Sequence, residues 1–424
     1  GLLNPKLARG HRGRRHAVER LAGWAARARD PERPLVWFHA SSVGEGLQAE
    51  SVLLELRRIV PDLQYVYTHY SPSAEALARR LPVDAADYLP YDLPGPVERL
   101  LDVLSPRLLV FAKLDLWPEL AARAAARGTT VAMVAATVSP GSGRLRWPAR
   151  ALLRAGYAAV GAAAAIADDD AARLGRLGVF PERIQVLGDP RFDSVADRIA
   201  GVAADEPLLR FGRGAPTLVA GSTWPEDESV LLEAFARLLP RHPAARLIVV
   251  PHEPTASHLA STERVAARLG LPVPLRLSQA GGPVPLLLVD RVGVLATLYG
   301  AGTMAYVGGG FGRAGLHSVL EPAAWALPVA FGPRWRESRD AASLLEAGAA
   351  RALTRRGTEA VQELLETWSR WIEREDDRRA EGERAAALVA RGRGAAQRSA
   401  EMLAGLISSR HPRTSPSAAR RDQA

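Results

Sequence analysis

The chain has 424 residues, of which 47% are hydrophobic and 24% are charged, a composition typical of a globular protein with more than one core. The absence of cysteine excludes a disulfide scaffold, a cysteine-based zinc site, an iron–sulfur cluster and a thiol nucleophile. No apolar run approaches the roughly 18 residues that a membrane span requires.

The net charge of +9 is concentrated at the two ends of the sequence. Residues 1–33 carry a net +6 and residues 410–424 a net +3, so residues 34–409 are balanced. Nucleic-acid binders more often carry their charge on the folded body among aromatic residues, so we expect no nucleic-acid partner. We expect residues 1–33 to form a basic arm that contacts an anionic membrane surface. A merely solvated, arginine-rich terminus remains the alternative.

The first half of the sequence alternates short apolar runs with amphipathic stretches. Predicted strands cover residues 35–39, 64–68, 107–111, 130–135 and 184–187. Between them, residues 46–59 and 118–127 have helical spacing. This alternation predicts an α/β domain with a doubly wound parallel sheet.

The pattern then restarts. Predicted strands cover residues 217–221, 246–250, 284–289, 303–307 and 328–331, with helices at residues 226–238, 256–269 and 319–326. We expect a first Rossmann-like domain at residues 34–195, a linker at 196–216, a second domain at 217–356, helices at 357–409 and a disordered tail at 410–424. Two such domains facing across a cleft resemble the GT-B architecture, with ligands beyond the carboxyl ends of the strands.

The segment from Trp37 to Gly46 is the first candidate for chemistry. A predicted strand ends in small residues and a helix begins near Glu45. Small residues allow a ligand to approach the backbone closely, and a carboxylate at this position could act as a general base. The structural alternative is that Glu45 only favours the start of the helix, as acidic residues do in a first turn.

A glycine-rich loop at residues 306–322 is the second candidate. It follows a predicted strand and precedes a helix, whose free N–H groups could bind a phosphate, while Glu321 could bind ribose hydroxyls. Asp168-Asp169-Asp170 imitates a metal-binding triplet, but its position before a helical stretch favours helix capping. We therefore predict no metal site.

Six blocks support a resemblance to a known family: Asn4-Pro5-Lys6, residues 37–45, Leu116-Trp117-Pro118, and residues 188–193, 221–228 and 308–333. Each is weak alone, but all six in this order resemble the 3-deoxy-D-manno-octulosonic acid (Kdo) transferases of lipopolysaccharide synthesis. The resemblance covers residues 4–348. It implies a GT-B fold, CMP-Kdo as the donor substrate, no cofactor, a lipid A precursor as acceptor, and attachment to the cytoplasmic face of the inner membrane. An anchor helix is common in the family, and we expect that this chain does not contain it.

The resemblance also implies roles for particular residues. Glu45 corresponds to the catalytic base of an inverting reaction, and Arg191 to a cation that stabilises the departing CMP; Lys113 lies in a further catalytic segment. The acceptor is expected at Ser41, Ser42 and Gly44. The donor is expected at Pro251, His252, Val292, Gly293, Val294, Gly309, Gly310, His317, Ser318, Val319, Leu320 and Glu321.

Four positions depart from the pattern of many family members, which have an acidic residue at Lys113 and, in some cases, Arg at His252, Glu at Val294 and Asn at Ser318. Three of the four lie at donor contacts, so two other hypotheses stay open. One is another GT-B enzyme, either a nucleotide-sugar epimerase or a transferase with a different donor. The other is a non-catalytic protein that binds membranes or nucleic acid through its basic ends, although Glu45 and Arg191 argue against it.

Overall fold

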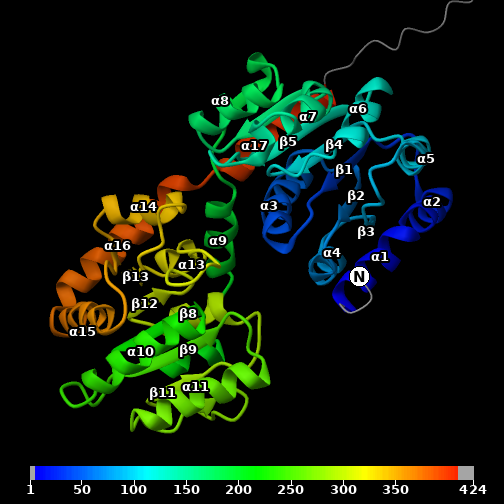
Figure 1. Cartoon of the computed structure of the whole chain (residues 1–424). Coiled ribbons are helices and arrows are strands. Elements are labelled where there is room, and N and C mark those ends of the chain that lie inside the picture. The colour runs from blue at the N-terminus through cyan, green and yellow to red at the C-terminus, as the bar shows by residue number, and fades with distance from the viewer. Residues whose placement is uncertain (1–4, 409–424) are drawn as a thin grey trace, which may run out of the picture. The chain divides into compact units, whose positions relative to one another are not determined.

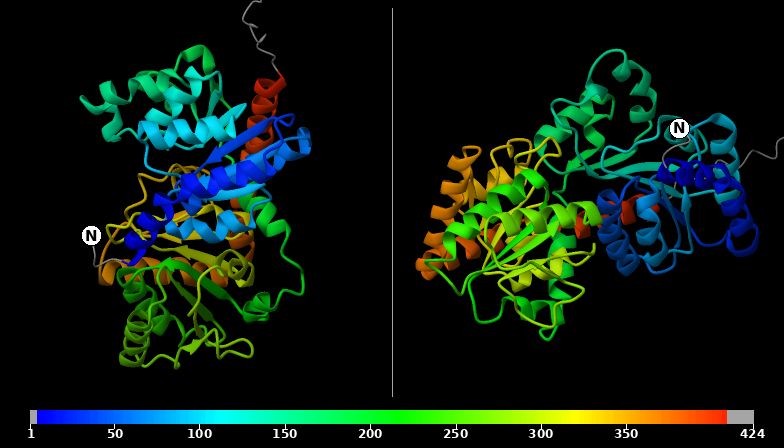
Figure 2. Two further views of the ribbon diagram at one scale, coloured as in Figure 1. Left: turned by 90° about the vertical axis from the view of Figure 1, so that its right-hand side faces the viewer. Right: turned by 60° about the horizontal axis from the view of Figure 1, so that its bottom comes forward.

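The computed structural model describes residues 5–408, and the chain divides into two compact units (Figure 1). The described part of unit 1 comprises residues 5–193 and 394–408, and unit 2 comprises residues 194–393. Each unit contains one seven-stranded sheet. Helices cover both faces of each sheet (Figure 2). The α/β doubly wound fold class predicted from the sequence is therefore confirmed.

The sheet of unit 1 is parallel throughout, with the strand order β3-β2-β1-β4-β5-β6-β7. Every residue of β1, β2 and β4 is buried, because helices cover both faces, and such strands appear in the sequence as continuous apolar runs. The strands are β1 (Leu35–His39), β2 (Gln64–His69), β3 (Ala85–Tyr88), β4 (Leu108–Ala112), β5 (Thr130–Ala136), β6 (Ala162–Ala165) and β7 (Ile184–Val186).

The helices of unit 1 pack on the sheet in two layers with separate apolar cores. Side chains of α2, α5, α6, α7 and α8 share one core, and those of α3, α4 and α17 share the other. The helices are α1 (Pro5–Arg15), α2 (Ala17–Ala28), α3 (Val43–Ile59), α4 (Glu75–Arg80), α5 (Pro94–Leu104), α6 (Pro118–Ala126), α7 (Ala149–Ala158), α8 (Asp168–Leu177) and α17 (Ala395–Ser408), and α9 (Arg191–Ala200) continues into unit 2.

Unit 2 repeats this plan with the strand order β10-β11-β9-β8-β12-β13-β14. Its strands are β8 (Thr217–Thr223), β9 (Arg246–Pro251), β10 (Leu275–Arg276), β11 (Leu286–Leu288), β12 (Met304–Val307), β13 (Val329–Phe331) and β14 (Ala350–Ala352). Its helices are α10 (Pro225–Leu238), α11 (Ala256–Arg268), α12 (Leu295–Leu298), α13 (Leu320–Ala324), α14 (Arg339–Glu346), α15 (Thr358–Glu373) and α16 (Glu375–Gly392). The expected linker at residues 196–216 is not a separate segment, because it contains the end of α9 and a 3-10 helix (Pro207–Gly212).

Strand order reverses at the equivalent place in both sheets. In unit 1 the first strand, β1, lies between β2 and β4, and in unit 2 the first strand, β8, lies between β9 and β12. The loops that leave the carboxyl ends of these central neighbours diverge to opposite faces of the sheet. This divergence opens the crevice in which doubly wound proteins bind their ligands.

The described part of the expected N-terminal arm is folded, which corrects that prediction. Residues 5–28 form α1 and α2, and α2 buries Val18 and Leu21 in the core of unit 1. Much of the local positive charge is used internally. Arg20 binds Asp87 on β3 through two hydrogen bonds of 2.5 and 2.7 Å, and Arg9 is paired with Glu75.

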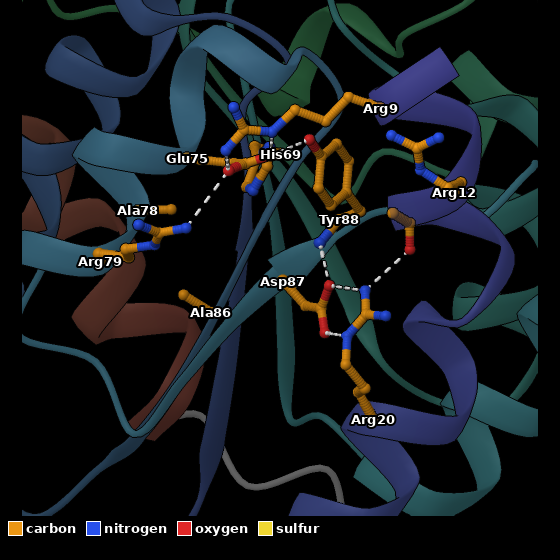
Figure 3. A pocket seen from close by; sticks show the side chains of 11 residues that line it. Arg9, Arg12, Arg20, His69, Glu75, Ala78, Arg79, Ala86, Asp87 and Tyr88 are labelled. Carbon is orange, nitrogen blue, oxygen red and sulfur yellow. Dashed lines mark hydrogen bonds and ion pairs between the residues drawn. The ribbon is translucent and has the colours of Figure 1, made fainter. Parts of the chain in front are cut away.

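These ion pairs line a cavity of about 520 Å³ beside α1, α4 and β3 (Figure 3). Burial alone would raise the pKa of Glu75, but hydrogen bonds from Tyr88 and Arg9 hold that pKa below its ordinary value. Both carboxylates on the wall already accept hydrogen bonds from the arginines. The cavity contains none of the predicted site residues, and its ion pairs attach α1 to α4 and α2 to the edge strand β3.

The C-terminal helices also differ from the single group expected at residues 357–409. α15 and α16 belong to unit 2, whereas α17 belongs to unit 1, where it packs against α3 through Ala396, Ala400 and Leu403. Asp193 accepts hydrogen bonds from Gly394 N (2.6 Å) and Ala396 N (2.9 Å) at the start of α17. The expected tail at residues 410–424 lies outside the described residues. Within residues 5–408, no helix is both long enough and apolar enough to cross a membrane.

We predict that Leu21→Ala destabilises the protein by about 2–5 kcal/mol, because it leaves a cavity where α2 meets the core. Leu21 is only 2% exposed. Chemical denaturation measures the effect, with Leu54→Ala as the control, because Leu54 on α3 is 47% exposed and its loss should change stability by less than about 0.5 kcal/mol. A Leu21→Ala variant as stable as the control would show that α2 is a dispensable arm after all.

Candidate active site

Glu45 lies in the first turn of α3, just beyond the carboxyl end of β1. Its Oε2 accepts hydrogen bonds from Ser42 N (3.0 Å) and Ser42 Oγ (2.9 Å), and Glu45 N donates in return to Ser42 Oγ (3.5 Å), which completes a capping box. Its Oε1 has no hydrogen bond within residues 5–408, and the carboxylate is only partly buried. Glu45 therefore does start the helix, as the structural alternative held, yet one oxygen is left to accept a proton. Gly44 beside it has no atom within 4 Å of the place where a Cβ would lie.

Ser41 connects this turn to Asp115, which follows β4 across the strand-order reversal. Ser41 Oγ donates to Asp115, and the Asp115 carboxylate lies 3.2 Å from Nε2 of His39, the last residue of β1. His39 is fully buried and its Nδ1 contacts Thr68 Oγ1 at 3.0 Å. Burial would raise the pKa of Asp115, but His39 and Ser41 together hold that pKa below its ordinary value. The site thus has a second, ionised carboxylate in a fixed position.

The two predicted cationic residues of unit 1 lie elsewhere in the fold, Lys113 at the end of β4 and Arg191 at the start of α9. Lys113 directly follows β4 in a left-handed backbone conformation (φ 62°), and its N–H donates to Val134 O at 2.8 Å. Arg191 begins α9 and binds Asp189 through Nε (2.8 Å) and Nη2 (2.7 Å). Asp189 therefore holds the guanidinium of Arg191 in a defined orientation.

In unit 2 the predicted donor residues His252 and His317 form an aromatic stack with Trp224. The ring of His252 lies 4.3 Å from that of His317 and 5.1 Å from that of Trp224. Trp224 Nε1 donates to His317 Nε2 at 3.1 Å, so this nitrogen must be unprotonated. Burial, followed by the proximity of His252, lowers the pKa of His317 to about 4. The stack offers flat aromatic surfaces beyond the carboxyl ends of β8 and β9.

The glycine loop after β12 is held by Asp227, which the sequence-based site did not include. The buried Asp227 carboxylate accepts hydrogen bonds from Gly309 N (2.9 Å), Tyr306 Oη (2.9 Å) and Trp224 N (3.0 Å). A Cβ on Gly310 would lie 2.7 Å from Gly332, and Gly309 has a φ of 92°. Only glycine fits these two positions, because the first has no room and the second is left-handed. Burial raises the pKa of Asp227, against the effect of its three donors.

Glu321 lies in the first turn of α13, close to this loop in sequence. Its Oε1 is 2.9 Å from Nη1 of Arg198 on α9. Burial raises the pKa of Glu321, and Arg198 opposes that shift. The side chains of Val319 and Leu320 are fully buried, so these two predicted donor residues could contact a ligand only through their backbone, whereas Ser318 is exposed.

The remaining predicted donor residues also follow strands of the second sheet. Pro251 ends β9, and Val292, Gly293 and Val294 lie between β11 and α12. Val292 is 76% exposed. The donor residues thus share the carboxyl edge of one sheet, although within residues 5–408 none of residues 292–294 forms a hydrogen bond with the aromatic stack.

The acidic triplet Asp168-Asp169-Asp170 forms the first turn of α8. Asp170 accepts hydrogen bonds from Val138 N and Thr137 Oγ1 at 2.7 and 3.1 Å. Arg173 lies 2.5 Å from Asp169. In the part of the chain that the structure describes, no group of three or more His, Asp or Glu side chains could hold a metal ion.

Comparison with known proteins identifies the family. The family described as 3-Deoxy-D-manno-octulosonic-acid transferase (kdotransferase) matches residues 15–194. A 3-deoxy-D-manno-octulosonic acid transferase of Bordetella pertussis is 32% identical over 355 residues, which cover 79% of this chain and 79% of that protein. The chain belongs to the Kdo transferase family. This resemblance, predicted from the six sequence blocks, is confirmed, and the protein is a glycosyltransferase of that family.

Solved structures show the same fold at much lower identity. A glycosyltransferase from Rickettsia africae matches with a TM-score of 0.61 and 10% identity over 89% of this chain and 99% of that one. A UDP-GlcNAc 2-epimerase from Neisseria meningitidis matches with a TM-score of 0.62 and 12% identity over 88% of this chain and 99% of that one. The Kdo transferase has the GT-B fold that the sequence predicted.

Sequence reasoning did not find His39, Asp115, Trp224 or Asp227 as site residues of this Kdo transferase. His39 and Trp224 lay inside blocks that carried the resemblance, and each ends or follows a predicted strand. Asp115 lies two residues beyond Lys113, after a predicted strand. The sequence signal for these residues was their position after the strands that flank the strand-order reversal. Any polar residue at such a position shares this signal, so it does not single them out.

We predict that His317 titrates with a midpoint near pH 4 in NMR spectra of its ring, well below the ordinary value of about 6.5. The unfolded chain binds this proton first as the pH falls, so stability should decrease between pH 6.5 and pH 4 and this contribution should end below that window. His317→Asn should show a smaller decrease across the same window in urea denaturation. A midpoint near 6.5, or equal pH dependence in both proteins, would contradict a half-buried imidazole that stays neutral.

Proposed function

We propose that this Kdo transferase moves Kdo from CMP-Kdo to a lipid A precursor of the lipid IVA type, with inversion at the anomeric carbon. The observation that carries the proposal is that only one oxygen of the Glu45 carboxylate accepts hydrogen bonds. One oxygen is held by Ser42 while the other is free, on a turn lined by Ser41 and Gly44. That oxygen can take the proton of an acceptor hydroxyl as the hydroxyl attacks the anomeric carbon of Kdo.

Unit 2 offers groups suited to a nucleotide. In the proposal, a cytosine ring or ribose packs near His252 and His317, and the backbone of the loop at Gly309 and Gly310 approaches the phosphate. Arg191 stabilises the negative charge that grows on the departing CMP. The bond from the anomeric carbon to the CMP phosphate breaks as the bond to the acceptor oxygen forms, and Glu45 keeps the proton.

We propose that the reaction needs neither a metal ion nor a cofactor. The argument rests on the leaving group, since CMP departs with one phosphate rather than a pyrophosphate and has less charge to neutralise. Turnover of CMP-Kdo with a tetraacylated lipid A precursor, followed by mass spectrometry with and without a chelator, tests both parts. Product formation that requires an added divalent cation would overturn this part of the proposal.

The second candidate is a GT-B enzyme that uses another nucleotide sugar, as an epimerase or as a transferase. The fold shared with a UDP-GlcNAc 2-epimerase and the residues His252, Val294 and Ser318 favour testing it. A panel of CMP-Kdo, CMP-sialic acid and UDP-sugars separates the candidates. We expect turnover of CMP-Kdo alone, and turnover of a UDP-sugar would favour the second candidate.

A lipid acceptor places the reaction at a membrane, and we propose the cytoplasmic face of the inner membrane. The basic helices α1 and α2 support contact with anionic lipids, because Arg12 and Arg15 are exposed. We propose no nucleic-acid partner. Removing residues 1–33 is not a clean test of this contact, because α2 belongs to the core.

We predict that Glu45→Gln lowers the turnover rate by about 10²–10⁴-fold while the protein stays folded and binds the donor. The amide oxygen can still accept the hydrogen bonds of Ser42, so the start of α3 is preserved, but the amide cannot take a proton. Initial rates and thermal unfolding measure the two effects. Glu55→Gln is the control on the same helix, and it should keep both. More than a tenth of the wild-type rate in Glu45→Gln would reduce Glu45 to a helix-start residue.

Arg191→Ala should lower the turnover rate more than it raises the donor Michaelis constant. The guanidinium is assigned to charge that develops in the transition state, and such interactions act on the rate. Steady-state kinetics with varied CMP-Kdo measure the two constants, with Arg183→Ala as the control, since Arg183 lies over the ring of Phe180 instead. An unchanged rate with a large rise in the Michaelis constant would show that Arg191 only binds the donor.

A further inference from the structure

Residues 143–154 of unit 1 expose an apolar surface that the site described above does not use. Trp147 is 82% exposed and Leu152 is 77% exposed. Trp147 precedes α7, and Leu152 lies on the exposed arc of that helix together with Ala151 and Ala155. The opposite side of α7 is anchored, because Gly156 and Tyr157 are buried. The apolar side chains are thus presented outward by a helix that is itself held firmly on the unit.

The charged side chains of this segment all have one sign. Arg146, Arg150 and Arg154 are exposed beside Trp147 and Leu152, and the sequence contains no Asp or Glu between Glu119 and Asp168. None of these three arginines forms an ion pair within residues 5–408, in contrast to Arg9 and Arg20 on α1 and α2. We call Arg146, Trp147, Arg150, Leu152 and Arg154 the Trp147 surface.

The Trp147 surface is connected to the candidate active site. The segment that carries it follows the carboxyl end of β5, and Glu45 and Asp115 follow the carboxyl ends of β1 and β4 in the same parallel sheet. Arg144, at the start of the segment, donates a hydrogen bond to the carbonyl oxygen of Leu114, next to Asp115. Arg144 also contributes to the lowered pKa of Asp115, after burial, His39 and Ser41. Whatever binds the Trp147 surface is therefore held at the acceptor edge of unit 1.

We propose that the Trp147 surface binds a bilayer with anionic headgroups and holds the acceptor edge of unit 1 at that bilayer. Tryptophan prefers the boundary between headgroups and acyl chains, and a short amphipathic helix with arginines beside its apolar face lies in the same plane. The unpaired arginines select negatively charged lipids. The proposal rests on the proposed function only in that a lipid acceptor gives the contact its purpose, since vesicle binding can be measured without any turnover.

The test is co-sedimentation of the whole chain with vesicles of phosphatidylglycerol and phosphatidylcholine, or of phosphatidylcholine alone. We expect binding to the anionic vesicles at about 0.1 M salt and release at about 1 M, where the screening length falls from about 10 to about 3 Å. Trp147→Ser with Leu152→Ser, and separately Arg150→Gln with Arg154→Gln, should each weaken binding by about tenfold or more.

The matched control is Val273→Ser with Arg268→Gln, which removes an 89% exposed apolar side chain and an exposed arginine from unit 2. It should bind vesicles as the wild type does. In addition, lipids with a quencher in the acyl chains should reduce tryptophan fluorescence in the wild type but less in Trp147→Phe, which locates the contact at this side chain. All changed residues are exposed, and circular dichroism verifies that each variant is folded.

Equal binding to neutral and anionic vesicles, or unchanged binding by both double variants, would overturn the proposal. So would a change in oligomeric state without a change in vesicle binding, which would assign the surface to a second copy of the chain. The double variants should also lose transfer to an acylated acceptor in vesicles and keep transfer to a deacylated, water-soluble acceptor. If the wild type transfers Kdo to neither acceptor, the proposed function fails while the vesicle measurements still decide this inference.

Discussion

The reversal of strand order beside β1 and beside β8 is the constraint on which both halves of the candidate site depend. Neighbouring strands there send their following loops to opposite faces of the sheet, so backbone and polar side chains remain uncovered at the carboxyl edge. Glu45 and Asp115 follow the two central strands of unit 1, and Trp224 and Gly309 follow those of unit 2. In the proposed function, proton acceptance uses this opening in unit 1 and nucleotide binding uses the equivalent opening in unit 2.

The carboxylates in these openings differ in how many of their oxygen atoms already accept hydrogen bonds. Asp227 accepts three hydrogen bonds and is fully buried, so it fixes the glycine loop and has nothing left to offer a substrate. Asp115 is likewise held between His39 and Ser41. Glu45 differs because only Oε2 is engaged. A carboxylate that is held by one oxygen and free at the other combines a fixed position with the capacity to react.

The parts of the fold and site predicted from the sequence are those encoded locally. The buried strands β1 and β4 are continuous apolar runs in the sequence. Glu45 follows β1 in the segment from Trp37 to Gly46, which was recognisable from the sequence alone. The four-alanine strand β6 was not predicted, because alanine has little preference for strands and only the cover on both faces makes it one. The pairing of Arg20 with Asp87 joins residues far apart in the sequence, so the sequence did not show that the basic N-terminal segment packs on unit 1. Asp115 was missed for the same reason, because its partners His39 and Ser41 lie at the end of another strand and far away in the sequence.

The return of the chain to unit 1 at α17 has a consequence for how the protein is made. Residues 194–393 are synthesised between β7 and α17, yet α17 covers α3 and joins the core formed by Val36 and Val110. Until the ribosome has added residues 395–408, unit 1 lacks this cover and exposes part of an apolar face. Contacts that close so late are slow to form and leave a growing chain open to aggregation. Asp193 is synthesised long before Gly394 and Ala396, from whose N–H groups it accepts hydrogen bonds at the start of α17 once that helix docks.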